Sequence, residues 1–290
     1  MSQRRPPRTR ATPFGRVVIA LIAVVGVAAG VRAVVALVDG GDGPAVGRSP
    51  GPSASETSPA GGPSTPTSTT PADESLPPCR YGNLPALDQQ YGRWDRTFLD
   101  TTYALAPTYA PPGLVSVSEA GFEGDGVVRE LLVPDLTALR KAAEAAGNPV
   151  DVLVAYRSFL HQSLLFHKRV EQEGHAGALA TTARPGHSEH QLGTTVDFRT
   201  QGELDVTQDW ENTPAGAWMA ANSWRFGFVL SYPRGLQDVT CYAYEPWHFR
   251  YFGRDLATAI HDSGLTPREL LWRQAARDVA FPSPEGSPAQ

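Results

Sequence analysis

Hydrophobic residues are distributed unevenly along this chain of 290 residues. The 22 residues from Val17 to Val38 are apolar except for Arg32, whereas the stretch from Gly40 to Pro78 has almost no large apolar side chains. From Cys79 onward, aliphatic and aromatic residues become dense. The pattern predicts a basic segment 1–16, an apolar segment 17–38, a disordered linker 39–78, a folded body 79–280 and a disordered tail 281–290.

Within the body, the spacing of apolar residues predicts both helices and strands. Apolar residues recur at helical spacing in Asp135–Ala146, and Gly147 is placed to end that helix. Ser158 is a good cap for a helix that ends near Gly174. Further helices are expected at 214–224, at 253–263 and after the capping box 266–269, and strands at 150–155, 195–198 and 226–231. Since these elements show no regular βαβ rhythm, we expect an α+β domain with a small, mostly antiparallel sheet flanked by helices.

The apolar segment 17–38 has the length of a helix that crosses a bilayer. Five arginines precede it, which favours a cytoplasmic N-terminus and an extracytoplasmic body. Arg32 lies near the far end, where its long side chain can reach the interface. We expect an uncleaved single-pass anchor in the cell membrane; the alternative is a long signal peptide, cut near Ala28–Ala33, that leaves a secreted body.

Charge and cysteine content narrow the function classes. From Asp39 onward the chain has 19 basic and 30 acidic residues, so we expect no nucleic-acid partner. Two cysteines are too few for a four-cysteine zinc module. Outside the cytoplasm, Cys79 and Cys241 are most simply a disulfide, and the alternative is two independent buried thiols.

Two clusters in the body contain possible metal ligands. His190 and Asp197 are seven residues apart with Gly193 between them, and Glu245 stands three residues before His248. Two imidazoles and one carboxylate would leave a fourth position for water on Zn²⁺, and Glu245 would then be the general base. Each pair alone is more often ordinary surface or core structure, so spacing by itself leaves the metal site open.

A third cluster follows the strand expected at 150–155. Arg157 stands directly after that strand, and Gln162 comes about one helical turn further on. A charged arginine at the end of a buried strand needs a partner. Local reasoning allows either a structural ion pair or a receiver for a substrate carboxylate or oxyanion.

Taken together, the motifs resemble the VanY-type D-alanyl-D-alanine carboxypeptidases. The resemblance spans roughly Cys79 to Trp272 and rests on Tyr-Arg-Ser-x3-Gln at 156–162, Pro-Gly-His-Ser-Glu-His-Gln-x-Gly-x3-Asp at 185–197, Tyr-Pro at 232–233 and Glu-Pro-Trp-His-x-Arg-Tyr at 245–251. It implies the fold shared by D-Ala-D-Ala peptidases and the amino-terminal signalling domain of Hedgehog proteins. One departure is Thr195, which stands where that family usually has a small alanine.

The resemblance also implies roles for individual residues. It implies that the ligands of Zn²⁺ are His190, Asp197 and His248, that the catalytic base is Glu245, that Arg157 steadies the oxyanion or the substrate carboxylate, and that Ser188 and Gln162 contact substrate. His187, three residues before His190, is expected to support the site or line the pocket rather than bind metal.

The function implied by the resemblance is removal of the terminal D-alanine from peptidoglycan stem peptides by metal-activated water. The expected partners are this peptide substrate and the membrane, and the body is expected to be a monomer. The alternatives are a D,D-dipeptidase, a peptidoglycan endopeptidase, or a Hedgehog-like zinc-binding or sensing domain without turnover. The presence of Glu245 favours an enzyme, because a non-catalytic relative would be expected to lose its base.

Overall fold

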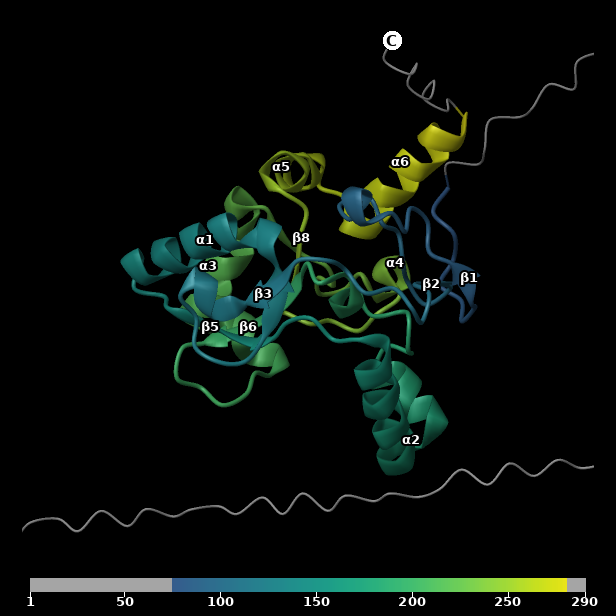
Figure 1. Ribbon diagram of the computed structural model, residues 1–290, viewed down its shortest axis with the longest axis horizontal. Helices are drawn as coiled ribbons and strands as arrows, with labels where there is room; N and C mark the ends of the chain where they lie inside the picture. The colour runs from purple at the N-terminus through teal and green to yellow at the C-terminus, as the bar shows by residue number, and fades with distance from the viewer. Residues whose placement is uncertain (1–74, 281–290) are drawn as a thin grey trace, which may run out of the picture. The chain divides into compact units, whose positions relative to one another are not determined.

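A four-stranded antiparallel sheet lies at the centre of the computed structural model, which describes residues 75–280 (Figure 1). The strand order is β5 (Val150–Val154), β6 (Thr195–Thr200), β8 (His248–Tyr251) and β7 (Phe228–Leu230). Each neighbouring pair is antiparallel. The small antiparallel sheet expected from the sequence is therefore confirmed.

Helices α1 (Val133–Ala145) and α3 (Pro214–Asn222) pack beside each other against this sheet (Figure 1). The apolar stripe of α1 places Leu136 and Leu139 in the core, where both are fully buried. Phe198 from β6 lies among the rings of Phe228 and Phe249 in the same core. Burial of these side chains fixes β6 and β8, the strands that carry Asp197 and His248.

The remaining elements are short or lie at the edges of the sheet. Two small strand pairs are β1 (Leu84–Pro85) with β2 (Tyr103–Ala104), and β3 (Leu114–Ser116) with β4 (Val127–Arg129). Apart from α2, which is described below, the other α-helices of residues 75–280 are α4 (Gln237–Thr240), α5 (Arg254–Ser263) and α6 (Pro267–Ala280). Short 3-10 helices are η1 (Tyr91–Arg93), η2 (Val117–Ala120), η3 (Glu130–Leu132), η4 (Glu189–Leu192), η5 (Gln208–Asn212) and η6 (Ser223–Phe226).

Helix α2 (Phe159–Thr181) differs from its prediction. Ser158 caps it as expected, since the Ser158 hydroxyl accepts a hydrogen bond from the His161 amide at 3.2 Å. Gly174 leaves the helical conformation at φ +74°, but a second helical piece follows it. Figure 1 shows the two pieces of α2 side by side, extending away from the sheet. The predicted break at Gly174 is thus a turn within a helical pair.

Cys79 and Cys241 form a disulfide with Cα atoms 5.2 Å apart, which confirms their expected pairing. Among residues 75–280, no helix is both long enough and apolar enough to cross a bilayer. The anchor expected at 17–38, the basic segment 1–16, the tail 281–290 and all but the last residues of the linker 39–78 lie outside the described residues.

Candidate active site

The pairing of β6 with β8 places two predicted ligands opposite each other. Asp197 of β6 is the direct partner of His248 of β8 in the antiparallel register. His190 reaches the same point from η4, which precedes β6. Gly193 makes the turn between η4 and β6 at φ +71°, where an added Cβ would lie 3.0–3.1 Å from side-chain atoms of Arg129, Leu114 and Pro111.

The three side chains converge on one buried point. His190 Nε2 lies 3.2 Å from Asp197 Oδ2, and His248 Nδ1 lies 3.1 Å from Asp197 Oδ1. One ligand atom from each residue falls within 4.8 Å of the others. His190 Nδ1 donates to the Ala155 carbonyl at 2.8 Å, which leaves the Nε2 lone pair directed at this point. The geometry fits a single metal ion held by His190, Asp197 and His248.

Glu245 stands beside these three residues, in the turn that precedes β8. Its Oε2 lies 3.5 Å from His248 Nδ1, and 28% of its side chain remains exposed. Removal of water around the carboxylate raises the pKa of Glu245 to about 7, although the positive charges of His248 and Arg157 oppose the shift. A carboxylate with such a pKa suits proton transfer near neutral pH.

Sequence reasoning missed Glu189, a buried carboxylate behind the site. Its Oε2 accepts hydrogen bonds from His248 Nε2 at 3.0 Å and from the Ser231 hydroxyl at 2.6 Å. Its Oε1 accepts from Arg250 Nη1 at 3.0 Å. Because His248 donates its Nε2–H to Glu189, the Nδ1 atom is left to face Asp197 and the metal point.

The electrostatics of Glu189 reflect this network. Burial alone would raise its pKa, but the charge of Arg250 and the hydrogen bond from His248 lower it to about 2. The sequence does contain a signal for the two donors to Glu189. His248 and Arg250 are two residues apart on one strand, so their side chains share a face. Glu189 itself stood inside the quoted motif without an assigned role.

We expect Glu189→Ala to lower the free energy of unfolding by about 3 kcal/mol, because the substitution leaves the Arg250 charge buried without its partner. Chemical denaturation measures this difference. Glu144→Ala is the matched control, since Glu144 pairs with Arg140 at the surface of α1 and should change stability by less than about 1 kcal/mol. Equal losses in the two variants would contradict a structural role for the Glu189 network.

Arg157, Ser188 and Gln162 all line one cleft of about 460 Å³ together with the candidate ligands and Glu245. Arg157 Nη2 donates to the Ser188 hydroxyl at 3.4 Å, and its buried Nε has no partner among the described residues. Burial lowers the pKa of Arg157. The carboxylates whose charges oppose this shift are Asp197 and Glu245, two residues of the site itself, which favours a role of Arg157 in the site over a separate structural ion pair. Gln162 donates to the Ala183 carbonyl at 2.6 Å, and its Oε1 has no partner within residues 75–280.

His187 supports the site and is not one of the converging ligands, as expected from the sequence. Its Nδ1 lies 2.7 Å from the Asp100 carbonyl, and its Nε2 lies 3.2 Å from Asn83 Oδ1. Its own carbonyl accepts a hydrogen bond from the Tyr242 hydroxyl at 2.8 Å. His187 therefore ties the loop before Ser188 to the N-terminal part of the body.

Comparison with known proteins places this cleft in a family. Residues 127–254 match the family described as VanY, D-alanyl-D-alanine carboxypeptidase, and this range contains His190, Asp197, Glu245 and His248. YodJ of Bacillus subtilis is 33% identical over 174 residues, which cover 58% of this chain and 64% of YodJ. The D-alanyl-D-alanine carboxypeptidase of Enterococcus faecalis is 35% identical over 147 residues, covering 48% of this chain and 53% of that protein. The chain thus spans between about half and two thirds of the length of these curated relatives.

Solved structures show the same likeness. The structure of the LdcB LD-carboxypeptidase is 32% identical with a TM-score of 0.55, covering 59% of this chain and 83% of that one. A crystal structure of a vancomycin-resistance D,D-pentapeptidase VanY, in complex with Zn(II), is 28% identical with a TM-score of 0.53 and covers 61% and 99%. The likeness in fold therefore points to the same group of proteins as the likeness in sequence.

Proposed function

The chain belongs to the VanY family of D-alanyl-D-alanine carboxypeptidases, and we propose that it removes the terminal D-alanine from peptidoglycan stem peptides by zinc-assisted hydrolysis. One observation carries the proposal. His190, Asp197 and His248 converge within 4.8 Å in the cleft that also holds Glu245 and Arg157. A metal, a base and a cation together suit the hydrolysis of a peptide with a free carboxylate.

The residues present fit zinc. Two imidazole nitrogens and one carboxylate oxygen are good donors to Zn²⁺ and leave one tetrahedral position for water. The zinc-bound VanY structure supports the same choice of metal. When bound, zinc lowers the pKa of its water toward about 7 and polarises the scissile carbonyl. His190 and His248 present their site-facing nitrogens because Ala155 and Glu189 bind the opposite nitrogens.

Glu245 moves the proton. Its carboxylate accepts a proton from the attacking water and then gives it to the nitrogen of the departing D-alanine. No covalent intermediate with the protein is needed. The position of Glu245, with Oε2 3.5 Å from His248 Nδ1, lets one carboxylate serve both transfers beside the metal point.

Arg157 and Ser188 bind the substrate's terminal carboxylate. The Nε of Arg157, which has no partner in the described part of the chain, and the hydroxyl of Ser188 offer charged and neutral donors in the cleft. Since the guanidinium is mostly removed from water, its attraction for a carboxylate is stronger than at the surface.

We also propose that the body acts outside the cytoplasm as a monomer held at the membrane by residues 17–38. The apolar run and the preceding arginines support this location, and the Cys79–Cys241 disulfide fits an oxidising compartment. Peptidoglycan lies within reach of a linker of this length.

The likeness to LdcB favours a second candidate, an L,D-carboxypeptidase, because LdcB is named for that activity and is 32% identical. The test incubates the full chain with a pentapeptide ending in D-Ala-D-Ala and with a tetrapeptide that ends in D-Ala after an L-centre. We expect single D-alanine from the pentapeptide. Release from the tetrapeptide alone would show an L,D-carboxypeptidase. Cleavage of free D-Ala-D-Ala, assayed in parallel, with neither longer peptide cut would show a D,D-dipeptidase, and cleavage of none of the three would favour a Hedgehog-like binding role.

A further inference from the structure

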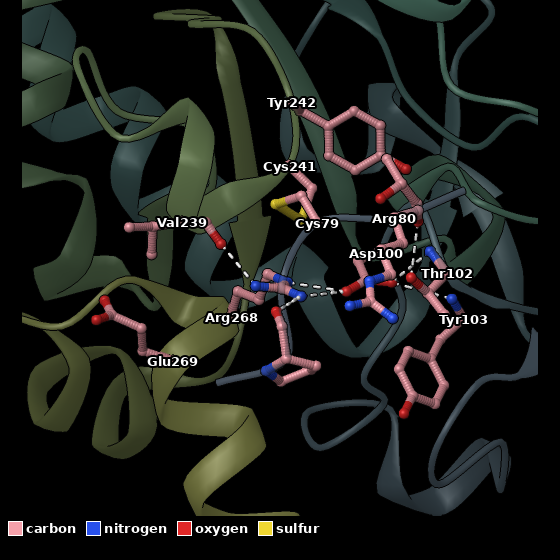
Figure 2. Close-up of polar contacts among 12 residues, drawn as sticks. Cys79, Arg80, Asp100, Thr102, Tyr103, Val239, Cys241, Tyr242, Arg268 and Glu269 are labelled. Atoms are coloured by element: carbon pink, nitrogen blue, oxygen red, sulfur yellow. Dashed lines mark hydrogen bonds and ion pairs between the residues drawn. A yellow bond between two sulfur atoms is a disulfide. The ribbon is translucent and has the colours of Figure 1, made fainter. Parts of the chain in front are cut away.

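Residues 79–83, which we name the strap, begin at one wall of the cleft. Cys79 is bonded to Cys241 (Figure 2), and Cys241 lines the cleft together with Gln237 and Tyr242. This wall continues along the chain to Glu245. The disulfide therefore joins the start of the strap covalently to the segment that carries the proposed base.

The strap reaches a second part of the cleft lining, in α2, through Tyr81. The Tyr81 hydroxyl donates to the carbonyl of Leu179 in α2 at 3.3 Å, and both residues line the cleft. Arg184 lies over the Tyr81 ring at 5.5 Å and donates to the Gly82 carbonyl at 2.5 Å. The strap thus spans from the 237–245 wall to the α2 wall.

Polar contacts of Arg268 and Thr102 hold the strap and the chain before it in place. Figure 2 shows Arg268 of α6 donating to Asp100 Oδ2 through Nε and Nη2, at 2.8 and 2.7 Å. The same guanidinium donates to the carbonyls of Val239 at 2.8 Å and Pro77 at 2.9 Å. Thr102 donates to the Arg80 carbonyl at 2.7 Å. One buried ion pair therefore fixes the chain before the strap, the loop under it and the wall beside it.

The strap is also connected to the groups proposed to bind the substrate carboxylate. Asn83 of the strap contacts His187, and the next residue is Ser188, whose hydroxyl contacts Arg157. A substrate whose last carboxylate binds Arg157 and Ser188 would have its terminus directed at the strap. A longer chain would then meet the strap instead of leaving the cleft.

We propose that the strap is an end stop that restricts cleavage to the last peptide bond of a substrate with a free terminal carboxylate. The inference rests on the proposed function and deepens it, because it selects the exopeptidase over the wall endopeptidase. Tyr81 is the specificity-determining residue, and the disulfide with the Arg268–Asp100 pair keeps it in position.

The test compares two peptides on the full chain. One is the pentapeptide ending in D-Ala-D-Ala, and the other carries one further glycine on the terminal carboxyl. We expect kcat/KM for cutting the D-Ala–D-Ala bond to be about 100-fold lower in the extended peptide. Tyr81→Ala, and separately Cys79→Ser with Cys241→Ser, should reduce this ratio by about 10-fold or more. Tyr91→Ala is the matched control, since Tyr91 is an exposed tyrosine outside the cleft lining and should leave the ratio unchanged.

The outcomes separate this inference from the proposed function. Equal cleavage of both peptides by the parent chain overturns the end stop and leaves the peptidase proposal standing. An unchanged ratio in a folded Tyr81→Ala chain also overturns it, whatever the double serine variant does. If the parent chain cuts neither peptide, the proposed function fails. Calorimetric binding of the two peptides then tests whether the strap acts as an end stop. A preference for the shorter peptide that Tyr81→Ala removes would support the stop, whereas equal binding, or no binding, would overturn it.

Discussion

The Glu245→Gln variant should retain one equivalent of zinc and lose about 10³-fold in kcat/KM for the pentapeptide. Glutamine has nearly the same volume as glutamate but cannot accept a proton from water. Glu245 is not one of the three converging ligands, so the metal should stay. Steady-state kinetics and metal analysis of the same preparation measure the two parts of this expectation.

The pH dependence gives an independent check on Glu245. Burial raises its pKa to about 7, and a protonated carboxyl cannot act as a base. In the parent chain, kcat/KM should therefore fall as pH drops below the pKa of Glu245, and bound zinc draws this limb to lower pH. The Gln variant should lack the limb. Glu144→Gln, at the surface of α1, should behave like the parent; a Glu245→Gln chain with more than about a tenth of parental activity would contradict the assignment.

The His190→Ala variant should lose the bound zinc and with it all turnover. His190 supplies one of only two imidazoles in the cluster, and the two remaining ligands are too few to hold a catalytic ion tightly. Metal analysis after dialysis measures the loss. Calorimetric titration of the same variant with zinc measures its affinity for the metal directly, and so separates loss of the metal from a change in chemistry.

His187→Ala is the matched control for His190. His187 is equally buried and only three residues away, but its ring nitrogens face Asp100 and Asn83. We expect this variant to keep one equivalent of zinc, even if its stability falls. Full zinc retention by His190→Ala, or loss of zinc in both variants, would remove the evidence that His190 is a ligand.

Much of the fold could be predicted because its signals are local. The stripe of α1 and the strand at Val150–Val154 follow from spacing over a dozen residues or fewer. The pairs β1–β2 and β3–β4 could not be predicted, because strands of two or three residues are too short to show an alternation of apolar and polar positions. The second piece of α2 was missed because Gly174 normally ends a helix rather than turning it.

The site divides in the same way. The ligands and the base were found through motif resemblance, but the register that sets Asp197 opposite His248 belongs to the folded sheet. The contacts of Glu189 with Ser231 and Arg250 join residues 42 and 61 positions apart, so no local pattern reports them. The disulfide was predicted from compartment and cysteine count. That Cys241 lines the cleft required the structure.

The most direct test of zinc-assisted hydrolysis is restoration of activity by the metal. The full chain is stripped with a chelator, dialysed, and titrated with zinc while D-alanine release from the pentapeptide is measured. We expect no release without metal and a rise that stops at one zinc per chain, with no rise in Glu245→Gln. Undiminished release from the fully stripped chain would contradict the account.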